Sequence, residues 1–166
     1  MNPDPDTEQL RMDSPLGPLN LGATERGLAW AWFERAQKHA PDASAWKHAG
    51  KHPLLLEAAR QLKAYFADKL TEFDLPLDLT SGSAFQQSVW HALLEIPRGA
   101  TWSYGAMAGK LGKPSASRAV GAAVGRNPVG IIVPCHRVIG ADRSLTGYAG
   151  GLDRKIALLR LEGVLL

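Results

Sequence analysis

The chain has 166 residues, of which 45% are hydrophobic and 21% charged, so it can bury a core and is neither disordered nor fibrous. Its one cysteine, Cys135, excludes an internal disulfide, an all-cysteine zinc site and a thiolate-ligated iron–sulfur cluster. Residues 1–82 hold 9 basic and 12 acidic residues, whereas residues 83–166 hold 10 and 4, so only the second half is suited to face a polyanion.

The N-terminal part has the pattern of a small sheet followed by a helix. Apolar and polar residues alternate over the first 35 residues, and breaks at Pro15–Pro18 and Thr24–Gly27 divide them into a three-stranded meander. The polar stretch 36–53 is expected to be a loop. Apolar residues at helical spacing from Leu55 to Phe66 then predict an amphipathic helix that covers one face of the sheet.

A short linker of small residues, Ser81–Ser83, predicts the boundary between two domains, residues 1–82 and residues 83–166. Ser83 and Gln86 fit a capping box, which predicts that the second domain begins with a helix. The boundary therefore separates the sheet from a mostly helical second half.

Two further short helices are predicted in the second domain. Ser103 is suited to cap a helix that runs to Leu111, and Ser115 to cap another that ends near Val124. Because the tight turn Gly112–Pro114 joins them, the pair resembles a helix-turn-helix.

Cys135 lies in a polar stretch between two apolar segments. The run Val129–Val133 predicts a short buried strand, and apolar residues resume at Val138. Two interpretations of the thiol stay open. It is either a small core side chain, the common fate of a lone intracellular cysteine, or a nucleophile whose thiolate form is favoured by the adjacent His136 and Arg137.

The last predicted helix, Leu152–Glu162, ends before Gly163, a residue typical of a helix C-terminus. Glu162 borders the apolar face of this helix, at the end where the helix dipole disfavours an anion. It is either an exposed glutamate with a small penalty or a residue with a compensating partner. The second interpretation gives a relay in which Glu162 orients His136, which in turn activates Cys135.

No metal or cofactor site is expected. His39, His48 and His52 fall in the polar loop, and His91 falls alone on the first helix of the second domain. Without a carboxylate in register, these histidines are interpreted as solvated side chains. The sequence also contains no phosphate-cradling loop and no dinucleotide fingerprint.

A series of short motifs follows the second half of the chain. Its members are Phe85–Gln86, Val89–Trp90, Ser103–Tyr104, Arg118–Gly121, Arg126–Pro128, Pro134–Val138, Gly147–Tyr148 and Gly150–Leu152. In this order they resemble the signatures of the O6-alkylguanine-DNA alkyltransferases, closely over residues 83–163 and only in general layout before them. Five consecutive signature residues and several separate matches argue against a chance resemblance.

Together with this resemblance, the predicted elements indicate an α+β fold. A small N-terminal three-stranded sheet with a helix is followed by a mostly helical, winged-helix-like DNA-binding domain with a helix-turn-helix. The resemblance implies direct DNA repair, in which the protein flips a damaged base out of the duplex. It then takes the alkyl group from O6-alkylguanine, and from O4-alkylthymine, irreversibly onto Cys135. One molecule is consumed per lesion, without a cofactor.

The implied partner is alkylated double-stranded DNA, and the protein is expected to act as a monomer. The opening Met1–Thr7 lacks the basic and apolar regions of a signal peptide, and no apolar run has the roughly 20 residues of a membrane span. A bacterial protein that is cytoplasmic and associated with the nucleoid is therefore expected.

The resemblance also implies roles in the chemistry for individual residues. Cys135 is the nucleophile, and His136, through a water, and Glu162 form the base relay. Asn127 helps to hold the active-site turn by hydrogen bonding. Tyr104 hydrogen-bonds the guanine and helps to protonate it as a leaving group.

Other residues are expected to contact DNA or to line the alkyl pocket. Arg118 takes the vacated place in the base stack, and the family presents this helix to the minor groove, where Ala119, Ala122 and Ala123 allow close approach. The other DNA contacts expected are Ser103, Tyr104 and Arg126. The expected pocket residues are Val138, Tyr148, Ala149, Gly150 and Lys155.

Two departures from human-type members affect the expected pocket. Gly130 stands where those members have a proline, and Ala149 where they have a serine. Because Gly130 leaves one wall less apolar, we expect poor reaction with benzyl-type free-base inhibitors. Some members also bind a structural zinc through cysteines in the first domain, and this chain has no cysteine there.

Three other functions stay open at this point. Alkyltransferase-like proteins share the fold and bind alkylated DNA without the cysteine, which Cys135 argues against. A helix-turn-helix transcription factor would need base-reading side chains, yet residues 116–124 offer only Ser117 and Arg118. A cysteine hydrolase that used Cys135 and His136 would turn over many substrates per molecule.

Overall fold

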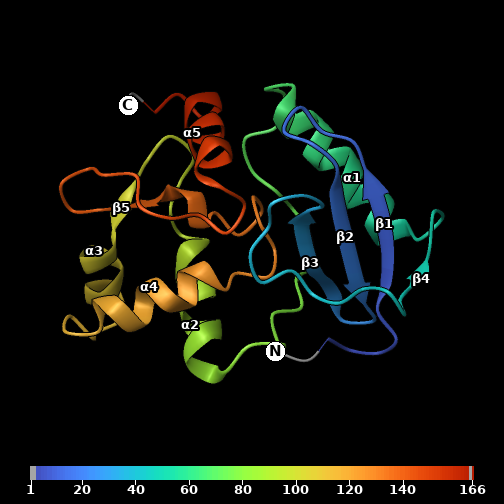
Figure 1. Cartoon of the computed structure of the whole chain (residues 1–166), viewed down its shortest axis with the longest axis horizontal. Helices are drawn as coiled ribbons and strands as arrows, with labels where there is room; N and C mark the ends of the chain where they lie inside the picture. The colour runs from blue at the N-terminus through green and yellow to red at the C-terminus, as the bar shows by residue number, and fades with distance from the viewer. Residues whose placement is uncertain (1–2, 165) are drawn as a thin grey trace.

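The chain folds into a sheet half (residues 3–82) and a helical half (residues 83–164) that lie side by side (Figure 1). The computed structural model describes residues 3–164 and 166. Helix α1 lies against the sheet, and helices α2 to α5 belong to the other half. The strands are β1 (Glu8–Met12), β2 (Leu19–Thr24), β3 (Gly27–Phe33) and β4 (Lys47–His48), in the spatial order β3-β2-β1-β4.

The meander predicted from the period-two alternation is confirmed, because β1 pairs with β2 and β2 with β3, both antiparallel. The sheet also has a fourth strand in the stretch expected to be a loop. Lys47 and His48 of β4 pair in parallel with Glu8 and Gln9 of β1. These two exposed polar residues have no apolar alternation, so their pattern could not indicate an edge strand.

The sheet is covered on both faces. The predicted amphipathic helix is confirmed as α1 (Pro53–Phe66), which contacts β1, β2 and β3 with its buried side chains. On the opposite face, Trp30, Trp32 and Trp46 form a small second core. A Cβ at Gly22 would come within 2.9 Å of the Trp46 ring, so only glycine lets these side chains pack on β2.

The helical half begins as its sequence predicts. α2 (Ala84–Leu93) starts with the capping box of Ser83 and Gln86, in which each side chain bonds the other residue's backbone N–H. Ser103 caps α3 (Tyr104–Lys110). Both predicted N-caps are therefore confirmed.

The N-cap predicted for the next helix is wrong. α4 (Ser117–Gly125) begins after Ala116, and no side chain caps it. The N–H of Ala116 donates to the carbonyl of Lys113 in a turn that leaves Ser115 outside the helix. A Ser before a helix is a common cap, but the local turn decides which residue comes first.

The strand predicted at Val129–Val133 is also wrong. This segment is a buried turn in which Ile131 has a φ of 72°, and a buried turn has the same apolar composition as a buried strand. The turn is attached to β3, because Ala31 N donates to Pro128 O and Gly130 N donates to Ala31 O, both at 2.9 Å. The two halves are thus joined next to Cys135.

The C-terminal part completes the winged-helix-like arrangement. β5 (Trp102–Ser103) and β6 (Val138–Ile139) form a parallel pair. α5 (Leu152–Leu161) ends at a left-handed Gly163, with Val164 N donating to Leu159 O in a Schellman motif. This end confirms the predicted stop at Gly163.

A single main core spans the two halves, from Leu21 in β2 through Trp90 in α2 to Leu158 in α5. The architecture is α+β, as predicted. Within residues 3–164 and 166, no helix is long and apolar enough to cross a membrane.

Candidate active site

Cys135 begins a short 3₁₀ helix, η1 (Cys135–Arg137), directly after the buried turn. The residue is only 6% exposed, and it lines a cavity of about 200 Å³. This cavity lies between α4, the segment after β6 and the loop that follows β3. It is lined by Lys38, His39, Tyr104, Gly121, Val124, Gly125, Cys135, Gly147, Tyr148 and Ala149.

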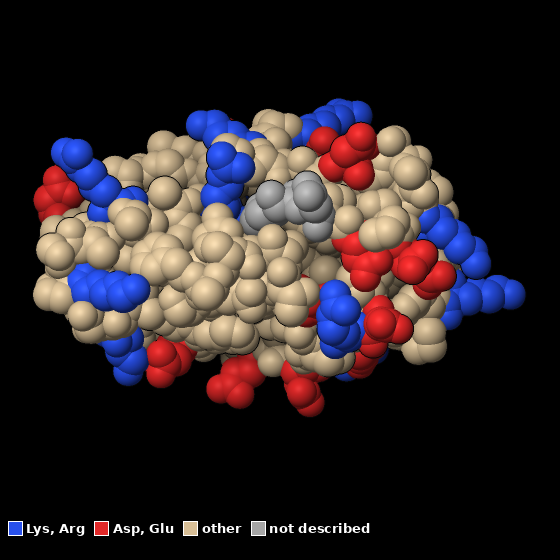
Figure 2. Space-filling view, turned by 90° about the horizontal axis from the view of Figure 1, so that it is seen from below, with Lys and Arg blue, Asp and Glu red and all other residues tan. Residues whose placement is uncertain are grey.

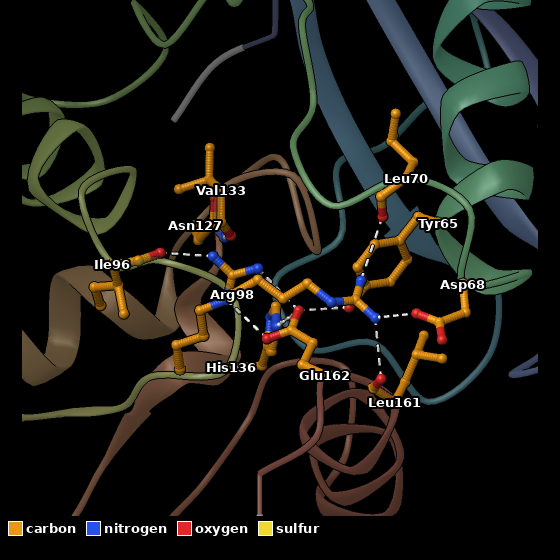
Figure 3. A network of polar contacts seen from close by, with 11 residues as sticks. Tyr65, Asp68, Leu70, Ile96, Arg98, Asn127, Val133, His136, Leu161 and Glu162 are labelled. Carbon is orange, nitrogen blue, oxygen red and sulfur yellow. Dashed lines mark hydrogen bonds and ion pairs between the residues drawn. The ribbon is translucent and has the colours of Figure 1, made fainter.

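Asn127 holds the turn that precedes the cysteine. Its Nδ2 donates to Val133 O at 2.7 Å, and its Oδ1 accepts from Val129 N at 3.0 Å. The side chain therefore spans the turn and fixes its two ends. Figure 3 shows Asn127 beside Val133, at one of these ends. Asn127 also lowers the pKa of the Cys135 thiol, against the larger effect of burial.

The resting thiol is protonated. Burial raises the pKa of Cys135, and the hydrogen bond with Asn127 and the charge of Lys155 only partly oppose this effect. The hypothesis that Arg137 favours the thiolate is wrong, because the Arg137 guanidinium binds Glu162 instead. The cysteine therefore needs a proton acceptor before it can act as a nucleophile.

His136 and Glu162 are in direct contact, as the relay interpretation requires. The distance between His136 Nε2 and Glu162 Oε2 is 2.8 Å, and both side chains are fully buried (Figure 3). Glu162 is thus not the exposed glutamate of the alternative interpretation. The contact with His136 offsets the unfavourable effect of the helix dipole on a carboxylate at the C-terminal end of α5.

The charges of the pair determine which ring nitrogen is free. Burial lowers the pKa of His136, so its imidazole is neutral near pH 7. Burial by itself would raise the pKa of Glu162, but hydrogen bonds from His136 and Arg137 hold it well below its usual range. A carboxylate only accepts, so Nε2 carries the proton and Nδ1 has the lone pair. In the described part of the chain, this buried Nδ1 has no hydrogen-bond partner.

Two further side chains hold Glu162. Arg137 donates through Nε to Oε1 at 2.8 Å and through Nη2 to Oε2 at 2.9 Å, while its Nη1 donates to Ile96 O. Tyr65 of α1 donates its hydroxyl to Oε2 at 2.6 Å. The sequence shows Arg137 as a neighbour of the cysteine but gives no sign that it binds Glu162. No motif marks Tyr65, which reaches the site from the sheet half.

Arg98 connects the C-terminal end of α5 to the segment that follows α1. Its Nη2 donates to Asp68 Oδ1 and Leu161 O, and its guanidinium lies over the Tyr65 ring, 5.4 Å from the centroid. Figure 3 shows this arginine between the end of α5 and the segment after α1. The end of the helix that holds Glu162 is therefore fixed to the sheet half.

The residues expected to meet DNA are mostly exposed on α4. Arg118, Ala119, Ala122 and Arg126 are exposed, whereas Ala123 is buried and its carbonyl accepts from Trp90 Nε1. Ala123 therefore packs against α2 instead of lining the outer face. On the face seen in Figure 2, acidic side chains cluster over the sheet half, and the helical half presents a broad surface with few charges.

The expected pocket residues fall into two groups. Tyr148 and Ala149 line the cavity, and the buried Gly150 borders a smaller space beside them. Val138 and Lys155 lie behind this wall instead. Lys155 is fully buried, its Nζ donates to the carbonyls of Val138 and Thr146, and burial lowers its pKa to about 8. The expectation that Lys155 lines the alkyl pocket is therefore wrong, because its side chain is fully buried and is not among the lining residues of the cavity.

The histidines outside the site do not form a metal centre with acidic or cysteine partners. In the described residues, no group of three His, Cys, Asp or Glu side chains is arranged to hold a metal ion. His52, expected to be solvated, instead caps α1 by accepting a hydrogen bond from Leu54 N.

Comparison with known proteins identifies the family to which this chain belongs. The sequence matches the 6-O-methylguanine DNA methyltransferase DNA binding domain over residues 84–164 and the ribonuclease-like domain of the same protein over residues 11–79. The chain belongs to the 6-O-methylguanine DNA methyltransferase family. The resemblance found in the sequence motifs is confirmed.

Individual relatives of the family agree along nearly the whole chain. The methylated-DNA–protein-cysteine methyltransferase of Methanosarcina acetivorans is 51% identical over 151 residues, which are 91% of this chain and 95% of the relative. The protein of that name from Mycobacterium tuberculosis H37Rv is 51% identical over 157 residues, 91% of this chain and 89% of the relative. The structure of Mycobacterium tuberculosis OGT in complex with DNA matches with a TM-score of 0.88 at 50% identity, covering 94% of this chain and 93% of that one.

Membership in this methyltransferase family identifies the general activity. The protein is an enzyme of DNA repair that transfers alkyl groups, and DNA is its partner. This activity differs from the transcription-factor and cysteine-hydrolase interpretations, and the family match supports neither of them.

Proposed function

We propose that the protein repairs O6-alkylguanine, and also O4-alkylthymine, in double-stranded DNA by moving the alkyl group irreversibly to Cys135, as a monomer that reacts once. The observation that supports this proposal best is the juxtaposition at η1. The thiol of Cys135 lines a cavity, and the next residue, His136, has a buried free Nδ1 and an Nε2 bonded to Glu162.

The proton path follows from the charges of the site. His136 Nδ1 takes the thiol proton, directly or through one water, and becomes an imidazolium that the Glu162 carboxylate stabilises. Glu162 itself keeps its negative charge, because Arg137 binds both of its oxygens. The proton therefore stays on the histidine.

The alkyl transfer is a displacement at carbon. The thiolate sulfur forms a bond to the alkyl carbon while the bond from that carbon to O6 breaks, and the electron pair leaves with guanine. Tyr104 lines the cavity and donates a proton toward the departing base. The thioether that results has no leaving group of comparable quality, so the reaction ends after one turnover.

The lesion reaches the cavity by base flipping. Arg118 is exposed near the start of α4, the helix that also supplies three lining residues, and its planar cation is suited to fill the vacated place in the stack. Ala119 and Ala122 keep the exposed surface of α4 low enough for close approach. Ser103 and Arg126 are the further DNA contacts proposed.

Gly130 supports the earlier expectation for bulky inhibitors. Its N–H donates to Ala31 O at 2.9 Å, and a Cβ there would lie 3.2 Å from the same oxygen. A proline could not make this hydrogen bond, so the wall near Tyr148 differs from that of human-type members. Poor reaction with benzyl-type free bases stays a prediction.

The test is the stoichiometry of transfer. The protein is mixed with an excess of duplex DNA that carries O6-methylguanine with a radiolabelled methyl group, and the label on the protein is counted and mapped. We expect one equivalent on Cys135 and none in Cys135→Ser. Label above one equivalent, or label on another residue, would contradict the proposal.

A second arm tests base flipping separately from chemistry. Arg118→Ala should lose about tenfold in the rate with duplex DNA, because flipping costs a few kcal/mol, and should keep the wild-type rate with a free O6-alkylguanine base. Lys110→Ala, an exposed residue at the end of α3, is the matched control. Equal losses with both substrates would assign Arg118 to the chemistry.

A further inference from the structure

The loop after β3 reaches across to the active-site cavity of the helical half. The Lys38 N–H donates to Ala149 O at 2.7 Å, and the Lys38 carbonyl accepts from Gln37 Nε2 at 3.3 Å. Gln37 in turn accepts from Phe33 N, the last residue of β3. The backbone of Lys38 is therefore held on both sides, once by the sheet half and once by the cavity wall.

Two side chains of this loop line the same cavity as Cys135. Lys38 and His39 are both exposed, and His39 adopts a left-handed φ of 59°. Arg126 directly follows Gly125, the last residue of α4 and a lining residue of the same cavity. Burial lowers the pKa of His39, and the charges of Arg126 and Lys38 act in the same direction. Positive and neutral nitrogen groups from both halves thus gather at one rim.

The positive charge at this rim is opposite in sign to the net charge of the sheet half. Residues 1–82 have an excess of acidic side chains, and arginines of this half, such as Arg11, Arg26 and Arg60, pair with carboxylates. Among the described residues, neither Lys38 nor Arg126 forms an ion pair. Lys38 lines the cavity and Arg126 follows the lining residue Gly125, so these two cations are suited to bind a polyanion at the cavity.

We propose that Lys38 and His39, together with Arg126, bind the phosphates that flank the nucleotide entering the cavity. A base that reaches Cys135 brings its sugar and phosphates to the rim, where an ammonium and a guanidinium can replace condensed counterions. The sheet half is then a second DNA-contacting element that positions the substrate. This inference rests on the proposed function, since it requires the damaged nucleotide to enter this cavity.

Substitution of Lys38 tests the inference. Lys38→Met keeps the length of the aliphatic chain and all the backbone hydrogen bonds. We expect alkyl transfer from duplex DNA at subsaturating protein to slow about fivefold, with an unchanged rate for a free O6-alkylguanine base. In a Cys135→Ser background, the salt dependence of binding to the alkylated duplex should fall by about 0.9 in the slope of log K against log salt. His39→Gln added to Lys38→Met should slow the duplex reaction further.

Lys51→Met is the matched control, because Lys51 is an exposed loop lysine of the same half that lines none of the cavity around Cys135. It should match the wild type in every measurement. A Lys38→Met protein that matches the wild type with duplex DNA, or that loses equally with the free base, would overturn the inference. Absence of label on Cys135 in the wild type would instead overturn the proposed function, so the two failures are distinguishable.

Discussion

The helical half and the sheet half contribute to one site in different ways. The helical half has an excess of basic residues and holds the motif residues Cys135, His136 and Glu162. The sheet half is acidic and has no recognisable motif, yet Tyr65 contacts Glu162 and Lys38 lines the cavity. A region without a recognisable sequence motif can therefore still contribute residues to the site.

The contacts of the two halves also differ in kind. The sheet half uses neutral groups, namely the hydroxyl of Tyr65 and the backbone groups of Ala31 and Lys38. Those of the helical half are charged and buried. This comparison predicts a large loss of unfolding free energy where a buried charge loses its partner. A smaller loss is expected where a neutral group is removed.

The largest effect is expected at Glu162. Glu162→Ala leaves the buried Arg137 guanidinium without its carboxylate and should lower the free energy of unfolding by about 3–5 kcal/mol. Denaturant unfolding measures this loss, and alkyl transfer should be lost as well. Glu57→Ala, which breaks an exposed ion pair on α1, is the control and should cost less than about 1 kcal/mol. Similar losses in both variants would mean that the buried network contributes no more than a surface pair.

The next effect tests the sheet half directly. Tyr65→Phe removes the hydroxyl that donates to Glu162 and should lower the free energy of unfolding by about 1.5–3 kcal/mol, the range for a hydrogen bond to a charged group. Phe66→Tyr, which adds a hydroxyl at the partly buried neighbouring position of α1, controls for the hydroxyl itself. A change below about 0.5 kcal/mol in Tyr65→Phe would show that the sheet half packs beside the network without supporting it.

Acidification should weaken the fold through His136. Burial lowers the pKa of His136 below the value of about 6.5 expected in the unfolded chain, so the unfolded state binds more protons between the two values. The free energy of unfolding should therefore be constant above that pH and fall by up to about 1.4 kcal/mol per pH unit below it. Urea unfolding at a series of pH values from 8 to 5 measures the slope, as an order-of-magnitude test.

Two variants test whether His136 causes this dependence of the unfolding free energy on pH. His136→Gln should flatten it, because the titrating imidazole is gone, whereas the exposed His91→Gln should retain it. Glu162 acts in the same direction at lower pH, since its pKa is also held below the usual range. An unchanged slope in His136→Gln would assign the acid sensitivity to other groups.

The smallest effect compares two serines of the helical half. Ser103→Ala removes the N-cap of α3 and should cost about 1 kcal/mol in unfolding free energy. Ser115→Ala should leave stability within about 0.5 kcal/mol, because Ser115 lies outside α4 and caps nothing. Thermal unfolding of the two variants measures this difference. A larger loss of stability in Ser115→Ala than in Ser103→Ala would contradict the assigned caps.

Local patterns were enough for most of the fold. Period-two alternation and helical spacing predicted the meander, α1 and α2, and the capping residues Ser83 and Ser103 were read correctly. The errors lie where composition is ambiguous. The buried turn at Val129–Val133 looks like a strand, and β4 is too short to have a pattern.

The sequence by itself determined that the protein has one thiol, a basic second half and the motif residues that identify its family. The tertiary structure decided which groups surround that thiol. Arg137 is next to Cys135 in sequence, yet it binds Glu162, because a buried carboxylate attracts the guanidinium more strongly than a neutral thiol does. Tyr65 and Lys38 reach the site only through packing of the two halves, since contacts between distant segments leave no spacing that a local pattern can reveal.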